Sequence, residues 1–448
     1  MYHRMYEYQY AQLHVSDDLD MKYILSAFWE GQEGSFLLWM FWHVILGFIL
    51  IRVAKSWEAP VLSILSLVQF FIGSMILGVY LFEDFKVGAN PLMMLRDVMD
   101  IPLFNQEDYV TLLQGNGLNP LLQNYWMTIH PPTLFLGFAS TTIPFAFALA
   151  GLWNGRHKEM LKVSFPWALF SGAILGTGIL MGGAWAYEAL TFGGYWAWDP
   201  VENASLVPWL ILIAGIHTHL IARATGHSIR ATYIFYILTF FFILYSTFLT
   251  RSGILGETSV HAFTEMGLEN QLLLFVSFFF VMPMAMFMVK QKSIPVIEKE
   301  EDISSKEFWI FIGALVLFFS AALITFYTSI PVYNKVREIF NPAFEGMVID
   351  DPVAHYNQQQ LWIGVFIGLL SGVGQYFRFK ESNFENHSKR FYMHFGIALL
   401  VSGILTALAT QWINARAWQY ILLMFCGCLL YTSPSPRDAT LSRMPSSA

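Results

Sequence analysis

The sequence predicts an all-α polytopic membrane protein, a bundle of about 10 to 11 transmembrane helices joined by loops. The first sign is composition: of the 448 residues, 56% are hydrophobic and 17% aromatic, and only 13% are charged. Soluble globular domains carry roughly twice that share of charge. The second sign is a series of apolar runs of about 20 residues, the length that a helix needs to cross a bilayer. The third is that these runs contain no Asp, Glu, Lys or Arg away from their first and last residues.

Ten such runs follow one another along the chain, and we expect residues 36–428 to form the helical bundle. The expected spans cover residues 36–52, 60–83, 133–153, 165–186, 205–222, 231–250, 270–289, 308–328, 360–377 and 391–410, and a partial eleventh starts near Ala417.

The distribution of basic residues predicts which loops face the cytoplasm. Loops 52–59, 154–164, 223–230, 290–307 and 378–390 together hold 15 of the 25 Lys and Arg residues, and cytoplasmic loops carry such an excess. The N-terminus and the segments 84–132, 251–269 and 329–359 are therefore expected outside, which in a bacterium is the periplasm. The net charge of −7 and the lack of a basic stripe argue against nucleic acid as a partner.

Both ends of the chain differ from the middle. Residues 1–35 are mostly polar and have no signal peptide, yet the topology places them outside, so we expect a periplasmic loop segment that begins inside a longer gene. Residues 429–448 become rich in Ser and Pro and are interpreted as a non-native tail. The two cysteines, Cys426 and Cys428, lie beside that change and are assigned no role.

A tryptophan-rich segment, residues 187–205, lies between the fourth and fifth expected spans on the outer side. It places Tyr195, Trp196 and Trp198 beside Gly193 and Gly194. Amphipathic rings collect at membrane boundaries, and glycine lets a backbone approach a flat ligand closely. A general aromatic belt would scatter its rings over many helix ends, so a ligand site is the better interpretation.

Histidines are the titratable residues inside the spans, tyrosine apart: His43, His217, His219 and His394. An ion-coupled transporter usually keeps carboxylates or lysines there, whereas imidazole suits haem iron. Helix rise places His217 about 9 Å and His394 about 5 Å above the inner end of their spans, a similar depth. His219 faces nearly the opposite side from His217; spacing alone leaves open which of the two faces the site. His43 has no partner at its depth and is expected to pack between helices.

Outer histidines form a second group. His130 precedes Pro131-Pro132 at the start of the third span, which predicts an extended, stiff residue suited to ligation. His261 lies in the outer loop after Arg251. His355 is also outer but has no motif, and is expected to be a solvated loop residue.

Weaker candidates lie near the same outer mouth. Glu188 comes just before the tryptophan-rich loop, and Arg251 ends the sixth span. Arg251 could pair with a haem propionate, or it could simply extend its charge towards water. Asp199 precedes Pro200 and suits the N-cap of the following helix, a role compatible with positioning a ligand. The inner-loop histidines His157, His227 and His387 are expected to accompany the charged loops.

The string from Gly193 to Ser205 resembles the tryptophan-rich signature of the haem-handling proteins of cytochrome c biogenesis. Within that group it is most similar to the F-type cytochrome c maturation proteins, the haem lyase subunits. Phe192 replaces the first Trp of the signature. His-Pro-Pro at 130–132, Arg-Ser-Gly at 251–253 and Val-His-Ala-Phe at 260–263 also match segments of that family.

The resemblance implies two haem sites. His130 and His261 would hold the iron of substrate haem at the periplasmic surface, with Trp196, Trp198 and Asp199 beside it. His217, which follows Pro208-Trp209-Leu210, and His394, in His394-Phe395-Gly396, would hold a resident haem b. The remaining residues expected around the haem groups are Gly193, Gly194, Tyr195, Glu188 and Arg251.

The implied activity is haem attachment, through thioether bonds, to the CxxCH motif of apocytochrome c in the bacterial inner membrane. The implied partners are a periplasmic haem chaperone (the E-type maturation protein), the H- and I-type proteins that present apocytochrome, and a membrane quinol as reductant. One alternative is a haem exporter or delivery protein like the shorter C-type relative. Another is a cytochrome b-type quinol oxidoreductase, but these commonly use regularly spaced histidine pairs on one helix, which this chain lacks.

Overall fold

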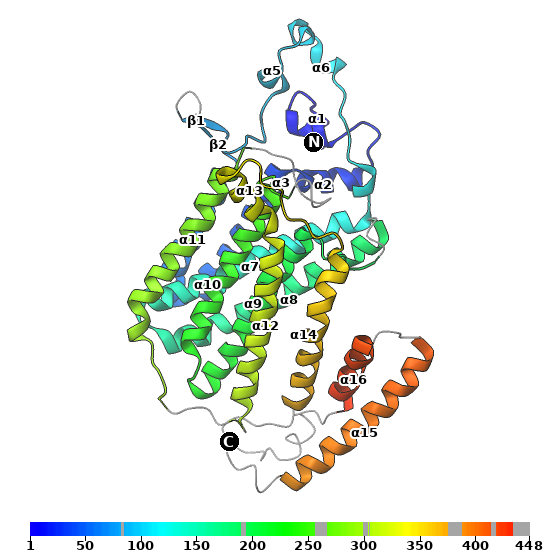
Figure 1. Cartoon of the computed structure of the whole chain (residues 1–448). Coiled ribbons are helices and arrows are strands. Elements are labelled where there is room, and N and C mark those ends of the chain that lie inside the picture. The colour runs from blue at the N-terminus through cyan, green and yellow to red at the C-terminus, as the bar shows by residue number, and fades with distance from the viewer. Residues whose placement is uncertain are drawn as a thin grey trace.

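The computed structural model describes residues 1–81, 85–189, 194–255, 267–298, 303, 305–374, 388–413 and 418–432. These residues form a bundle of long helices with one small two-stranded sheet (Figure 1). Nine of the described helices are long and apolar enough to cross a membrane. The prediction of an all-α polytopic membrane protein is therefore confirmed.

The N-terminal segment is folded rather than an open loop. It contains α1 (Gln9–His14) and α2 (Met21–Glu30), and α3 (Gln32–Val53) already begins within it. Tyr6, Val15, Leu19 and Ile24 bury their side chains in a small apolar cluster of their own. Burial of these side chains explains why a segment that is mostly polar still packs against the bundle. It lies at the end of the bundle shown at the top of Figure 1, which we call the upper end.

The second expected span is shorter than predicted. After the 3-10 turn η1 (Lys55–Trp57), α4 (Glu58–Ser74) ends nine residues before position 83. Gly78 has a φ of 60°, a left-handed conformation that leads the chain out of the helix. Strands β1 (Val79–Leu81) and β2 (Phe85–Val87) then pair antiparallel. The end of the apolar run therefore forms an upper hairpin instead of helix.

The long connection after the hairpin leads into the two longest helices. It contains α5 (Leu95–Val98), η2 (Pro102–Asn105), α6 (Tyr109–Leu112) and η3 (Pro120–Leu122). Asn124 then caps α7 (Tyr125–Asn154) by accepting a hydrogen bond from the Trp126 amide. Gly155, with a φ of 67°, ends α7, and α8 (His157–Ala189) returns. These two helices pack extensively against each other.

The second half of the chain continues in the same manner. Its elements are α9 (Pro200–Thr225), α10 (Ile229–Arg251), α11 (Glu269–Lys290), η4 (Gln291–Ser293), α12 (Lys306–Thr328), α13 (Ile330–Phe340), α14 (Pro352–Gly374), α15 (Ser388–Ile413) and α16 (Trp418–Thr432). Helix α14 replaces the span expected at 360–377 but starts earlier, and its first turns carry the polar run His355–Gln360. It is not among the nine strongly apolar helices.

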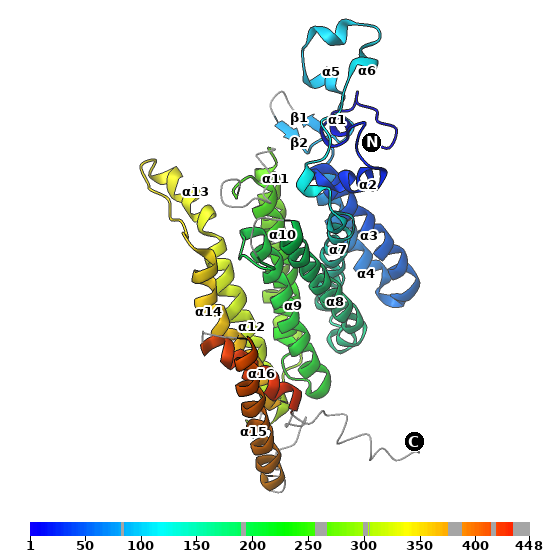
Figure 2. The ribbon, with the colours of Figure 1, turned by 90° about the vertical axis from the view of Figure 1, so that its right-hand side faces the viewer.

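The helices succeed one another across the molecule in pairs. Figure 2 shows α3 and α4 at one side, then α7 with α8, α9 with α10, and α12 with α14. Helix α16 packs on α14, and α15 packs on α16, at the far side. Rings fill the centre: Phe145 of α7 stacks on Phe240 of α10 with centroids 4.5 Å apart. The middle pairs are thus held by side chains buried on several helices at once.

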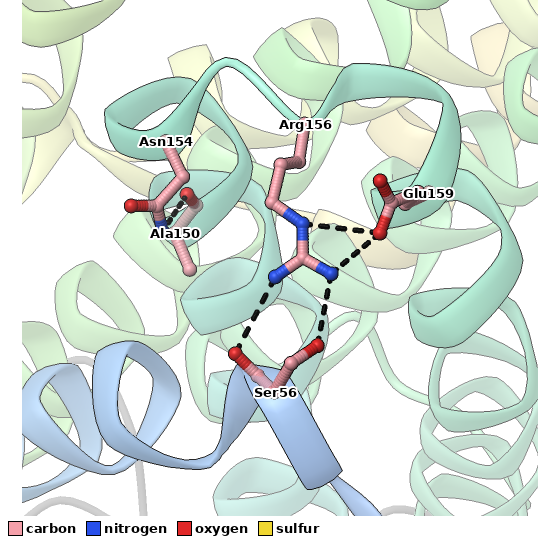
Figure 3. A network of polar contacts seen from close by, with 5 residues as sticks. All are labelled: Ser56, Ala150, Asn154, Arg156 and Glu159. Carbon is pink, nitrogen blue, oxygen red and sulfur yellow. Dashed lines mark hydrogen bonds and ion pairs between the residues drawn. The ribbon is translucent and has the colours of Figure 1, made fainter.

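At the lower end, Arg156 joins two helical hairpins (Figure 3). Its Nη2 donates to Ser56 Oγ at 2.9 Å and its Nε donates to Glu159 Oε2 at 3.0 Å. The guanidinium carbon also lies 4.3 Å from the ring centroid of Trp57. The turn between α3 and α4 is thereby fixed to the turn between α7 and α8. Within the second turn, Asn154 donates back to Ala150 O at 3.0 Å.

His157 corrects a prediction at this end. It was expected to accompany charged loop residues, but it is buried. Its Nδ1 lies 2.8 Å from the Tyr233 hydroxyl of α10, and its Nε2 lies 3.1 Å from Ser293 Oγ. A histidine whose two nitrogens are both hydrogen-bonded is a packing residue here, tying α8 to α10 and η4.

Candidate functional site

A cavity of about 580 Å³ lies at the upper end of the bundle, between α2, α3, α7, α8, the start of α9 and the end of α10. Small-molecule sites typically measure about 300–1,000 Å³. The wall of the cavity includes four tryptophans, a histidine and an arginine: Trp29, Trp39, Trp185, Trp196, His130 and Arg251. Three of these six, His130, Trp196 and Arg251, are among the residues predicted from the sequence. A larger apolar groove of about 1310 Å³ beside α1 and α2 contains none of the predicted residues.

His130 lines this cavity from inside α7, not from an extended residue before the helix. The prediction was wrong because the Asn124 cap starts α7 before the two prolines. The His130 Nδ1 lies 2.9 Å from the carbonyl oxygen of Gly178 in α8, so it carries the proton that the carbonyl accepts. This tautomer leaves the ring's lone pair on Nε2, the atom that can bind a metal.

Two glycines of α8 make room for the site. A Cβ at Gly182 would lie 2.9 Å from His130 Cε1, and a Cβ at Gly183 would lie 3.0 Å from the carbonyl oxygen of Tyr195. A side chain at either position would displace the histidine or the tryptophan-rich segment. Glycine is therefore needed for close approach at this wall.

The tryptophan-rich segment is held by a helix cap. Asp199 Oδ1 accepts from the Val201 amide at 2.9 Å, and Glu202 Oε2 accepts from the amides of Ala197 and Asp199 at 3.0 Å each. This is a capping box at the start of α9. The N-cap predicted for Asp199 is confirmed, and the cap fixes the backbone that carries both tryptophans.

The two tryptophans of the segment face different neighbours. Trp196 lines the cavity. The Trp198 Nε1 donates to Asn357 Oδ1 of α14 at 2.9 Å, and its ring stacks on Tyr356 with centroids 5.1 Å apart. The Trp198 backbone has a φ of 57°, an unusual, strained conformation for a bulky residue. Trp198 therefore anchors the segment to α14 and does not line the described cavity.

The other predicted residues near the mouth lie around the cavity rather than in it. Tyr195 is 60% exposed and stacks on Tyr187 of α8, with centroids 4.2 Å apart. Glu188 is exposed and accepts from Trp126 Nε1 at 2.6 Å. A Cβ at Gly194 would meet no atom within 4 Å. Gly193 lies outside the described residues.

Arg251 lies in the cavity wall and not at the water surface. It lines the cavity at the end of α10, and it lies within electrostatic range of Glu30, Glu33 and Tyr10. Glu30 in turn pairs with His14 of α1. A fixed cation therefore sits beside the space that a ligand would occupy.

The inner histidines differ in their hydrogen bonding. His219 is buried, with Nδ1 2.5 Å from the Tyr236 hydroxyl and Nε2 2.6 Å from Leu161 O, so both nitrogens are used. His217 is half-buried, and its Nδ1 lies 2.7 Å from Ile213 O. Within the described part of the chain its Nε2 has no hydrogen bond. Of the two, His217 is thus the one with a nitrogen available to a metal.

The helix that carries His394, the predicted partner of His217, does not pack on α9 among the described contacts. His394 is exposed on α15, which packs on α16, whereas α9 with His217 packs on α8, α10 and α12. His261, the predicted partner of His130, lies outside the described residues. Both pairings stay predictions.

Two further histidines have clear structural roles. His43 Nδ1 lies 3.1 Å from Gln69 Oε1 and its Nε2 lies 3.1 Å from Thr142 Oγ1, which confirms the predicted packing role between α3, α4 and α7. His355 corrects a prediction. It lies within α14, not in a solvated loop, and its ring packs edge-on to Tyr327 with centroids 4.3 Å apart.

The sequence interpretation missed the contribution of α2 and α3 to the cavity. Trp29, Glu30 and Trp39 all line it. Residues 26–35 were expected on the outer side, the same side as the tryptophan-rich segment, so their proximity could have been inferred. Trp39 lies inside an apolar span and carried no comparable signal.

Comparison with known proteins identifies the family. Residues 29–255 match the model of the family described as cytochrome C assembly protein. This region is just over half of the chain, and every residue that lines the cavity falls within it. The chain belongs to this family.

Relatives of this family member place it with the F-type cytochrome c maturation proteins. It is 36% identical over 248 residues to the cytochrome c-type biogenesis protein CcmF of Pseudomonas aeruginosa, covering 54% of this chain and 34% of that protein. Against CcmF of Escherichia coli it is 33% identical over 261 residues, 57% of this chain and 37% of that protein. Against the cytochrome c-type biogenesis protein NrfE of Haemophilus influenzae it is 32% identical over 275 residues, 60% and 40% of the two chains.

The chain covers only about a third of the length of the first of these relatives, as the 34% coverage of the P. aeruginosa protein shows. No solved structure matches the chain.

Proposed function

We propose that this chain is the haem lyase subunit of cytochrome c maturation, or its haem-binding part. In this proposal it receives substrate haem in the upper cavity and promotes covalent attachment of that haem to the CxxCH motif of apocytochrome c. The observation that carries the proposal is the cavity itself, where His130, Trp196 and Arg251 meet. Its support is that similar proteins are named cytochrome c-type biogenesis proteins.

The residues of the cavity fit a flat metal-bearing ligand. The bond from His130 Nδ1 to Gly178 O directs the ring, so that Nε2 is the nitrogen that would bind iron. Gly182 and Gly183 keep one wall free of side chains. Aromatic rings, among them Trp185 and Trp196, supply apolar surface that excludes water.

In this proposal the protein binds the haem and orients it for the reaction. In thioether formation a cysteine sulfur bonds to one vinyl carbon and the thiol proton goes to the other, so no electrons are gained or lost overall. His130, with His261 as second ligand, would hold the iron, and Trp196 would hold the ring plane. The chaperone of E type would bring haem, and the H- and I-type proteins would present the apocytochrome.

A resident haem b is the second part of the proposal. His217 would suit an iron ligand, because its Nδ1 is bonded to Ile213 O and its Nε2 has no hydrogen bond among the described residues. Its proposed partner His394 lies on α15, which does not pack on α9 among the described contacts. A membrane quinol as its reductant, and a bacterial inner membrane location with the upper end in the periplasm, belong to the same proposal.

The test is replacement of the outer ligand with chemical rescue. His130→Gly should weaken binding of added hemin to the purified chain, followed by absorbance, and free imidazole should restore it. The matched control is His3→Gly, which removes an exposed histidine that does not line the cavity. Unchanged hemin binding by His130→Gly would contradict the proposed site.

Coexpression with a CxxCH apocytochrome separates attachment from delivery. Covalent haem on the apocytochrome, detected by peroxidase stain and lost in His130→Gly, supports the lyase. Haem binding without any attachment supports the haem delivery alternative.

A further inference from the structure

The cavity contains hydrogen-bond donors that its own residues do not satisfy. Trp39 of α3 is fully buried and lines the cavity, and its Nε1 has no acceptor among the described residues. Trp196 lines the same cavity from the tryptophan-rich segment, and its buried Nε1 also has none within the described part of the chain. An indole N–H can donate but cannot accept. Buried donors without acceptors are unfavourable, so each marks a place for an acceptor from elsewhere.

Four of the five side-chain hydroxyls of the lining are, by contrast, occupied. These hydroxyls donate to backbone carbonyls: Ser35 to Gln32, Ser205 to Glu202, Thr247 to Ile243 and Thr250 to Ser246. Carboxylates of the lining are engaged as well. Glu202 accepts two backbone amides, and Glu30 pairs with His14. The indole N–H groups of Trp39 and Trp196 thus remain as buried donors of the described lining that need an acceptor.

The charge of the cavity indicates which kind of acceptor fits. Arg251 contributes a cation to the same wall. Since Glu30 and Glu202 already have partners, the additional acceptor is best an anion of the ligand. A carboxylate is suited to this role because hydrogen bonds to a charged acceptor are stronger than those to a neutral one.

We propose that Trp39 and Trp196 form a carboxylate-binding subsite, in which the two indole N–H groups donate to the propionate groups of the haem bound in the cavity. This inference rests on the proposed function. It gives Trp196 a hydrogen-bonding role in addition to its ring surface, and it assigns a binding role to Trp39.

Trp29 provides a matched control within the same cavity. It lines the cavity like Trp39, but its Nε1 already donates to Met127 O at 3.0 Å. A Trp→Phe change keeps an aromatic ring and removes the N–H in all three cases. Only at positions 39 and 196 is the lost N–H one that the ligand would use.

The experiment compares hemin with hemin dimethyl ester, in which both carboxylates are blocked. The purified chain in detergent is titrated with each compound, and partition into protein-free micelles is subtracted. The unaltered chain should prefer hemin about tenfold or more, the size expected for hydrogen bonds to a charged acceptor. Trp39→Phe and Trp196→Phe should each reduce that preference. Trp29→Phe should keep the ratio of the two affinities, even if it lowers both of them by disturbing the turn that carries His130.

Each outcome decides a different question. If the unaltered chain binds hemin and its ester equally, the subsite is overturned but the proposed function stands. The same conclusion follows if Trp29→Phe reduces the preference for hemin as much as Trp39→Phe and Trp196→Phe do. If neither compound binds, the proposed function itself fails. Should Trp39→Phe not fold, the acid–ester comparison on the unaltered chain and on Trp196→Phe still decides.

Discussion

Trp29 donates its indole N–H to the carbonyl oxygen of Met127 at 3.0 Å. Four residues further on is Pro131, which has no N–H, so this carbonyl lacks its ordinary helical donor. The tryptophan of α2 therefore replaces a hydrogen bond that proline removes from α7. The same proline follows His130, so the bond supports the helix turn that presents that histidine.

Trp29→Phe should lower the free energy of unfolding by about 1–3 kcal/mol, because it leaves a buried carbonyl without a donor. Unfolding in detergent, followed by circular dichroism against temperature, measures this. Trp126→Phe is the control, since its indole bonds to the exposed Glu188 and its loss should cost much less. Equal effects of the two changes would contradict the account.

Asn357→Leu should loosen the tryptophan-rich segment. The change removes the acceptor of the Trp198 N–H, which helps to keep Trp198 in its left-handed backbone conformation. Amide hydrogen exchange at Ala197 and Asp199 should accelerate, and Asn357→Asp, which keeps an acceptor, should restore protection. Unaltered exchange in Asn357→Leu would show that stacking on Tyr356 alone suffices.

His217→Ala should affect haem binding, whereas His219→Ala should affect stability. The first should remove the resident haem's absorbance in a reduced-minus-oxidised spectrum and leave folding intact, because His217 offers a nitrogen to a ligand. The second should cost stability, because it breaks bonds to Tyr236 and Leu161. Retained absorbance in His217→Ala would remove the inner site from the proposal.

His394→Ala tests the pairing that the described helices do not bring together. Loss of the same absorbance is expected if α15 moves its first turns towards α9 when haem binds. A normal spectrum would mean that a residue other than His394 holds this haem together with His217.

The N-terminal segment should lose stability at high pH. Burial, and then the hydrogen bond to Asp17, raise the pKa of Tyr6 to about 12, against about 10 in an unfolded chain. Its contribution is fully present below pH 10, because only the neutral form is populated in both states, and is lost as the pH rises through 12. In Tyr6→Phe, the free energy of unfolding measured at a series of pH values should fall less between pH 10 and 12. If the steep fall persists in Tyr6→Phe, another group is responsible for it.

Much of the fold followed from local patterns. Apolar runs placed the long helices, and Asp199 before Pro200 placed the start of α9, because caps and membrane length depend on short stretches of chain. The end of α4 did not follow, since the apolar run continues past Gly78 while the backbone turns there. His130 was predicted as an extended residue at the start of the third span, but it lies within α7, because the cap at Asn124 starts the helix before Pro131.

The composition of the cavity could be predicted only in part. His130, Trp196 and Arg251 carried motifs, whereas Trp39 lines the cavity because α3 packs on α7, a contact between distant parts of the chain. The histidines show the same limit. His219 and His217 are two residues apart, and only the tertiary contacts with Tyr236 and Leu161 show which one is already occupied.

The attachment of Trp198 to α14 makes the tryptophan-rich segment mechanically dependent on the late helices. Helix α14 carries α16, and α16 carries α15. If α14, α15 and α16 tilted together, Asn357 and Tyr356 would move with them. Trp198, which contacts both residues, would move next and would shift Trp196 in the cavity wall. The packing of α14 thus reaches the cavity wall through Trp198, although Trp198 itself does not line the cavity.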